Sequence, residues 1–208
     1  MFDLKLVYEK RGLSKYISHL DVNRVFQRAI KRSKLPVWYT QGFNPHIYLS
    51  FSMPLSLGFE SQCEYVMTRL LEKPECDIVA TLNKYLPTGI KIISATYDSP
   101  SDNSTKALYQ ISISTENYGE SLKKDFEQFM ACDKIEVEKK SKKGITTVDL
   151  KPHCDIKSVG FKSDKLVFDI VLPLSPDFSI NPTLFINAFL ESVNQNDAYV
   201  EVLKKETL

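Results

Sequence analysis

A polar stretch near the middle of the chain constrains the fold more than any other feature. Residues 99–106, within the sequence YDSPSDNSTKA, contain Ser, Asp, Asn and Pro without apolar periodicity, which is typical of a linker. The stretch divides the 208 residues into two nearly equal halves. In both halves the hydrophobic pattern changes between the two-residue period of a strand and the 3.6-residue period of a helix. The chain is therefore expected to fold as two units of mixed α and β structure.

The expected elements follow a similar order in both halves. In the first half they are a strand over 2–9, a helix over 18–34, extended segments over 37–40 and 48–53, a strand over 63–71, a helix over 75–86 and a strand over 90–97. In the second half they are a strand over 108–114, a helix over 120–131, strands over 134–140, 146–150 and 166–172, a helix over 181–193 with Asn181 as N-cap and Pro182 in its first turn, and a strand over 199–204.

This order of elements predicts an α+β fold made of two tandem ferredoxin-like (βαββαβ) halves with antiparallel sheets. The N-terminal domain would span residues 1–98 and the C-terminal domain residues 107–208, joined by the linker 99–106. Helices would cover one face of each sheet. The alternative is one continuous α+β domain whose halves share only the order of their elements.

Composition excludes several classes of protein. Hydrophobic residues make up 43% and charged residues 25% of the chain, which is ordinary for a globular protein and not for a disordered one. The first residues lack the apolar core of a signal peptide, and no apolar stretch has membrane length, so we expect a cytoplasmic protein without membrane segments. The four cysteines form no CxxC pair and no three-cysteine cluster. We therefore expect reduced thiols, with no metal, iron–sulfur cluster or other cofactor.

The most basic segment, residues 10–34, carries eight Lys or Arg residues against one acid, Asp21, although the whole chain has a net charge of only +1. It contains a helix start, where the Ser18 hydroxyl can cap the backbone and Asp21 can reach back toward it. At 100° per residue, three basic residues of this helix lie opposite its apolar arc and a fourth, Arg32, is adjacent to them. We call them the basic stripe: Arg24, Arg28, Lys31 and Arg32. Their single sign of charge favours a phosphate-binding surface, and the alternative is an ordinary solvated helix face.

Directly after this segment, residues 35–59 contain no charged side chain but six large aromatic side chains. Three prolines and two glycines exclude a single helix or strand, and also a membrane span. Within the run, Gly and Asn-Pro predict a turn in the sequence QGFNPH, residues 41–46, which we call the aromatic loop. It would present Phe43, Asn44 and His46 outward, where a histidine can bind an anion or exchange a proton.

His19 is the other candidate catalytic histidine. It falls on the same helical arc as Phe26 and Ile30, so it is expected to point toward the sheet and away from the basic stripe. The structural alternative is a partly buried histidine that is hydrogen-bonded to the backbone. His153, beside Cys154, has no further ligand nearby in the sequence and is not expected to bind a metal.

Several motifs resemble those of the bacterial radical SAM-linked protein family of unknown function. They are YISHLD at 16–21, RVFQRA at 24–29, LP at 35–36, QGFNPH at 41–46, LSF at 49–51, PL at 54–55, LG at 57–58, Ser61 with Glu64 and, more loosely, VDLKP at 148–152. Ile47 departs from the pattern, in which a proline is expected. Members are encoded beside, or fused to, a cobalamin-dependent-type radical SAM protein, commonly near ribonuclease and ribosomal-protein genes. The resemblance implies a radical SAM partner and a translation-related setting, and it assigns no reaction.

These observations lead to a first functional hypothesis, an accessory substrate-recognition subunit that binds RNA for a radical SAM enzyme and has no catalytic activity of its own. Because the chain lacks cluster cysteines, the partner would supply the radical chemistry. The basic stripe would contact phosphates, while Phe43, Asn44 and His46 would hold a base or an end group. Two alternatives remain open: a metal-independent endoribonuclease with His46 or His19 as general base, and a protein-docking module whose aromatic loop inserts into its partner.

Overall fold

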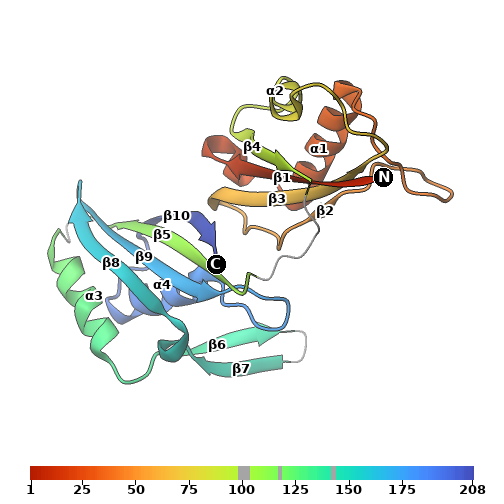
Figure 1. The fold of residues 1–208 in the computed structure, drawn as a ribbon. Helices are drawn as coiled ribbons and strands as arrows, with labels where there is room; N and C mark the ends of the chain where they lie inside the picture. Colours follow the sequence, from red (N-terminus) through yellow and green to blue (C-terminus); the bar gives the residue numbers. More distant parts are fainter. Residues whose placement is uncertain (98–103, 117–118, 142–143) are drawn as a thin grey trace. The chain divides into compact units, whose positions relative to one another are not determined.

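A computed structural model describes residues 1–97, 104–116, 119–141 and 144–208. The chain separates into two compact units, residues 1–103 and 104–208, and each is described by itself. Within each unit, every strand pair among the described residues is antiparallel. Helices accompany both sheets (Figure 1). The predicted α+β fold with antiparallel sheets is confirmed.

The first unit places two helices on one side of a small sheet (Figure 1). Its elements are β1 (Phe2–Lys10), the 3-10 helix η1 (Gly12–Tyr16), α1 (His19–Ser33), β2 (Ser50–Phe51), β3 (Glu60–Leu70), α2 (Ile78–Asn83) and β4 (Ile90–Thr96). The strand order is β4-β1-β3-β2. Alternation along β1 buries Leu4, Leu6 and Tyr8 on one face, and the same face carries Lys10, which is 3% exposed. Lys10 therefore does not add to the positive surface that its segment predicts.

Helix α1 packs on this sheet through its apolar arc. The fully buried Phe26 ring has its centroid 4.8 Å from that of Tyr8 on β1 and 5.8 Å from that of Phe51 on β2. Val22 and Ile30 are buried on the same side of the helix. Because this arc faces the sheet, the opposite side of α1, which carries the basic stripe, faces solvent.

The second unit has a four-stranded sheet in the order β10-β5-β9-β8 and a separate two-stranded hairpin, β6–β7. Its elements are β5 (Lys106–Ser114), α3 (Ser121–Ala131), β6 (Glu136–Ser141), β7 (Gly144–Asp149), η2 (Lys151–His153), β8 (Asp155–Lys162), β9 (Lys165–Pro173), α4 (Pro182–Ser192) and β10 (Tyr199–Thr207). Its core is aromatic, because Phe126 of α3 packs against Phe168 of β9 and Phe189 of α4. Asn181 caps α4 through the N–H of Thr183, as predicted.

The structure differs from the sequence prediction in three respects. Among the described residues, the strands expected at 134–140 and 146–150 pair with each other and not with the main sheet, so they form a separate hairpin. The missing sheet strand is β8, whose sequence DIKSVGFK does not alternate between apolar and polar residues. It joins β9 through Ser163 and Asp164, with φ of 53° and 57°, the backbone of a type I′ turn. Helix α2 is shorter than the expected 75–86, because Asp77 caps it at the N–H of Ala80.

The predicted linker lies mostly outside the described residues. Of residues 99–106, only 104–106 are described, and Lys106 already belongs to β5. Among the described helices, none is both long enough and apolar enough to cross a membrane.

Candidate functional site

Two side chains hold the amino-terminal end of α1. Ser18, the N-cap, accepts a hydrogen bond from the backbone N–H of Asp21 at 3.1 Å and donates one to Oδ2 of Asp21 at 2.7 Å. Arg24 donates to the other carboxylate oxygen, Oδ1, at 3.0 Å. The hydrogen bond from Ser18 and then that from Arg24 hold the pKa of Asp21 below its usual range. The capped helix start predicted from the sequence is confirmed.

Ser18→Ala is expected to lower the free energy of unfolding by about 1 kcal/mol, because a backbone N–H of α1 loses its acceptor. The pKa of Asp21 should rise toward its ordinary value at the same time, since its strongest hydrogen bond is removed. Urea denaturation measures the first effect and an NMR titration of the Asp21 carboxyl the second. Ser50→Ala, at an exposed serine of β2, is the matched control. Unchanged stability would show that the Ser18 cap has no structural role.

The basic stripe is exposed along its whole length, at Arg24, Arg28, Lys31 and Arg32. Arg24 forms an ion pair with Asp21, with 3.0 Å between Nη1 of Arg24 and Oδ1 of Asp21. The other three residues form no ion pair with any residue that the structure describes, so three cations remain available to an anionic ligand. Lys31 and Arg32 also lie in the last turn of α1, where positive charge favours the helix dipole. Helix stabilisation therefore accounts for a positive charge at Lys31 and Arg32, but it does not account for one at Arg28.

All six residues of the aromatic loop are exposed. Phe43 is the extreme case, with a relative exposure of 106%, so its ring contributes nothing to the core. A phenylalanine that stabilises the fold is normally buried. The Phe43 ring is instead available for stacking on a ligand or for insertion into a partner, which are the two uses that the sequence predicts.

His46 is held by the loop itself. Its ring nitrogen Nδ1 lies 3.0 Å from the Asn44 carbonyl oxygen and 3.1 Å from the Thr40 hydroxyl, which also accepts the His46 backbone N–H at 3.1 Å. In the tautomer that carries its proton on Nδ1, His46 donates a hydrogen bond to the Asn44 carbonyl. The lone pair of Nε2 then takes no part in the hydrogen bonds of the turn. Asn44 thus acts through its carbonyl, and its side chain remains exposed.

The residue that follows the aromatic loop is anchored on α1, next to the basic stripe. Gln27 Nε2 donates to the carbonyl oxygen of Ile47 at 2.9 Å. On α1, Gln27 is three and four residues from Arg24 and Lys31, so it neighbours both on the helix surface. Ile47 itself is 2% exposed and belongs to the core. This burial is a physical reason for an apolar residue at the position where the sequence pattern leads one to expect proline.

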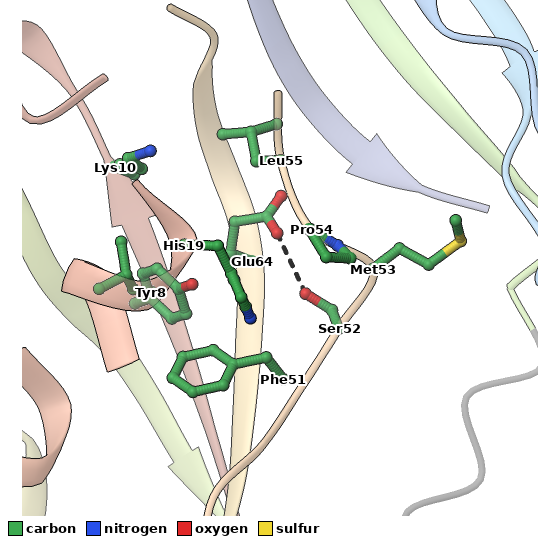
Figure 2. Close-up of a pocket in the computed structure, with 10 residues that line it drawn as sticks. Tyr8, Lys10, His19, Phe51, Ser52, Met53, Pro54, Leu55 and Glu64 are labelled. Carbon is green, nitrogen blue, oxygen red and sulfur yellow. Dashed lines mark hydrogen bonds between the residues drawn. The ribbon is translucent and has the colours of Figure 1, made fainter. Parts of the chain in front are cut away.

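A small polar pocket lies beside the first turn of α1 (Figure 2). Its lining includes Tyr8, Lys10, His19, Phe51, Ser52, Leu55 and Glu64. Its cavity volume is about 10 Å³, which is room for about one water molecule. His19 is exposed, and its ring centroid is 5.1 Å from that of Phe51. It points toward the sheet side as predicted, but it forms no hydrogen bond with the residues that the structure describes.

Sheet pairing assembles the floor of the pocket. In the β1–β3 register Tyr8 lies opposite Glu64 and Lys10 opposite Ser61, so β3 advances three residues where β1 advances two. This irregularity is a β-bulge, which re-aims side chains and is frequent beside functional sites. The Glu64 side chain is 2% exposed, and its carboxylate accepts hydrogen bonds from Ser61 at 2.8 Å and from Ser52 at 3.0 Å.

Burial sets the protonation of the two other polar groups on this floor. It raises the pKa of Tyr8 far above its usual value, with a smaller contribution from the Glu64 charge, so Tyr8 is a neutral phenol. Burial also lowers the pKa of Lys10, and the Glu64 charge opposes that change. Lys10 Nζ donates to the carbonyl oxygen of Ile17 at 3.0 Å.

A bacterial family matches most of the chain. It is described as "Uncharacterized protein conserved in bacteria (DUF2344)", and it matches residues 4–182. The chain belongs to this family. The match covers both the basic stripe with its aromatic loop and the residues of the pocket. The family description assigns no activity, and no curated protein sequence matches the chain.

Two solved structures are similar only weakly. One is described as an unknown protein from Galdieria sulphuraria; it is 11% identical, with 98% of each chain covered and a TM-score of 0.30. The other is described as a putative glycine cleavage system transcriptional repressor; it is 10% identical, with 97% of this chain and 95% of that chain covered and a TM-score of 0.25. Neither similarity is strong enough to carry an argument about function.

The sequence pattern of this family member predicts the basic stripe and the aromatic loop, but it does not predict the pocket. Tyr8 and Lys10 are more than 50 residues from Glu64, and only the β1–β3 pairing brings them together. The available signal was a charged residue at the end of an alternating strand, since Lys10 continues the buried face of Leu4, Leu6 and Tyr8. Among the described residues, no group of three or more His, Cys, Asp or Glu is placed to hold a metal ion.

Proposed function

We propose that this protein is an accessory substrate-recognition subunit that binds RNA for a radical SAM enzyme in a translation-related modification. The observation that carries the proposal is the basic stripe beside the aromatic loop. The three cations of this helix face that form no ion pair with the described residues would attract the negative phosphates of RNA. The exposed Phe43 ring would stack on a base that is not in a base pair. Single-stranded RNA combines both chemistries.

The proposed partner rests on sequence motifs. The aromatic-loop motif at 41–46 and the helix motif at 16–21 resemble those of proteins encoded beside, or fused to, radical SAM proteins. In this proposal the partner carries out the reaction, and this chain holds the substrate for it. A cytoplasmic location fits the cysteines, since Cys63, Cys76, Cys132 and Cys154 are all free thiols.

We further propose that both units are ferredoxin-like. If β1, β2, β3 and β4 of the first unit are the four strands of the motif, the corresponding strands of the second unit are β5, β8, β9 and β10. Both sheets then share one order, fourth-first-third-second. A helix follows the first strand and another follows the third strand in both units. The hairpin β6–β7 is an insertion between α3 and β8 in this comparison.

The proposal is tested by measuring the binding of purified protein to labelled single-stranded RNA by fluorescence anisotropy in the presence of EDTA. We expect binding without cleavage. Discrete cleavage products that disappear in His46→Ala would instead support a metal-independent endoribonuclease with His46 as general base, because Nε2 of His46 is open to a substrate. Capture from native cells with mass spectrometry of the bound protein tests the radical SAM partner separately.

Phe43→Ala is expected to weaken RNA binding by roughly 1–3 kcal/mol, the usual value for one stacked base. The salt dependence of binding should stay unchanged, since no charge is removed. Anisotropy titrations at several salt concentrations measure both quantities. Tyr85→Ala, at an exposed aromatic residue next to α2, is the matched control and should have no effect. Loss of partner capture in Phe43→Ala with unchanged RNA affinity would support the docking function instead.

A further inference from the structure

We infer that the pocket beside the first turn of α1 receives a ribose 2′-hydroxyl, so that this unit distinguishes RNA from DNA. The inference deepens the proposed function and rests on it for the ligand, a single-stranded RNA. The pocket is distinct from the two surfaces of the proposed function. In that proposal the basic stripe contacts phosphates and the aromatic loop holds a base, so neither surface distinguishes ribose from deoxyribose. A 2′-hydroxyl is the chemical group that marks a nucleotide as RNA, and it both donates and accepts a hydrogen bond.

Unused hydrogen-bonding groups converge on this pocket. Tyr8 is 4% exposed and lines the pocket, yet its hydroxyl forms no hydrogen bond with the described residues. Lys10 is 3% exposed, and its ammonium donates a single hydrogen bond to the described residues, to the Ile17 carbonyl, although it has three protons to donate. The Tyr8 hydroxyl is not among the completely buried side-chain atoms without a partner in the described part of the chain, so it is reachable from the space of the pocket. A hydroxyl oxygen that enters the pocket can accept a hydrogen bond from one of these two groups.

The size of the pocket selects a single small group. A volume of about 10 Å³ admits one oxygen atom with its proton and excludes a base or a whole phosphate. The apolar part of the lining suits the carbon atoms of a sugar ring, and it consists of Val22, Phe51, Met53, Pro54 and Leu55. His19, which lines the pocket (Figure 2), is exposed, so the group that enters can remain attached to a larger ligand outside.

The charges of the pocket favour a neutral group over an anion. Glu64 and Lys10 carry opposite charges, and both side chains are buried. A phosphate oxygen would be attracted by the Lys10 ammonium but repelled by the Glu64 carboxylate in a poorly solvated site. A hydroxyl can accept from Tyr8 or Lys10 and donate to the Glu64 carboxylate, whereas an anion can only accept. The pocket therefore complements the phosphate-binding stripe and does not duplicate it.

The position of the pocket is compatible with a shared RNA ligand. His19 is the first residue of α1, and Arg24 of the basic stripe follows five residues later. At about 1.5 Å per residue this separation is roughly 7.5 Å along the helix axis. Because the two residues lie about 140° apart around the helix, the strand must pass around the amino-terminal end of α1. We therefore expect the pocket to act on oligonucleotides of several residues and not on single nucleotides.

The experiment compares three oligonucleotides of one sequence with the full-length protein in EDTA: RNA, DNA and 2′-O-methyl RNA. Wild type should bind RNA about threefold to tenfold more tightly than DNA, the range for one neutral hydrogen bond. The 2′-O-methyl RNA should bind no better than DNA, since the pocket has no room for the additional methyl group. Tyr8→Phe removes only the hydroxyl and should abolish most of the preference for RNA. Tyr85→Phe, at an exposed tyrosine, is the matched control and should keep the preference.

The outcomes separate this inference from the proposed function. Equal affinity of wild type for all three oligonucleotides would overturn the 2′-hydroxyl subsite and leave RNA binding at the stripe and loop intact. A preference for RNA that Tyr8→Phe retains would also overturn the subsite. Failure to bind any oligonucleotide would overturn both. If Tyr8→Phe does not fold, the 2′-O-methyl comparison on the wild type decides alone, because it needs no variant.

Discussion

Replacement of Arg28, Lys31 and Arg32, the three cations without an ion pair among the described residues, by glutamine is expected to weaken binding to every single-stranded RNA and to flatten its salt dependence. Each lost phosphate contact should reduce the slope of log affinity against log salt by roughly 0.7, so the triple variant should lose about two units. Between 50 and 200 mM salt, the fall in affinity should then be roughly 20-fold smaller than for wild type. Glutamine keeps the length and helix propensity of the side chains, so the stability of α1 should change little.

The matched control removes three exposed lysines that lie outside α1, namely Lys84, Lys91 and Lys124. If only net charge matters, this variant will resemble the triple variant of the basic stripe. If the stripe is the binding surface, the control will retain the slope of wild type. A stripe variant that loses its partner enzyme in a pull-down but keeps its RNA affinity would establish a protein-docking helix. A variant that changes neither would reduce the basic stripe to a solvated helix face.

Local sequence signals predicted the parts of the fold that local forces determine. The start of α1 follows from Ser18 and Asp21, and that of α4 from Asn181, because a capping side chain acts within three residues of its own position. Phe43 and His46 are exposed because they belong to a turn, which Gly42 and Asn44-Pro45 favour. In these places a few neighbouring residues contain all the necessary information.

Other features depend on pairing between distant segments, which the sequence pattern does not specify. Strand β8 has no clear alternation, and its place in the sheet is set by its register with β9. The opposite charges of Lys10 and Glu64 come together through the β1–β3 register. From sequence, Lys10 counted toward a positive surface, whereas the pairing of β1 places it inside the unit. A candidate site built across two strands is therefore harder to predict than one built on a single helix.

The buried charges of the pocket lead to the largest expected effect on stability. Glu64→Leu should lower the free energy of unfolding by about 3–5 kcal/mol, because it leaves Lys10 without the opposite charge that compensates its burial. The hydroxyls of Ser52 and Ser61 also lose their acceptor. Urea denaturation provides the measurement. Glu75→Leu, at an exposed glutamate near α2, is the matched control and should change stability by no more than about 0.5 kcal/mol.

A second substitution in the same background separates charge from packing. Lys10→Met removes the uncompensated charge, so the double variant should be more stable than Glu64→Leu alone. The pH dependence gives an independent check. Burial lowers the pKa of Lys10 in the folded state, and loss of Glu64 lowers it further. Between that lowered value and about 10.4, the usual lysine pKa, the unfolded chain binds more protons, so Glu64→Leu should regain stability as the pH rises. A double variant no more stable than Glu64→Leu, with no gain at alkaline pH, would show that Glu64 stabilises the unit through its hydrogen bonds to Ser52 and Ser61.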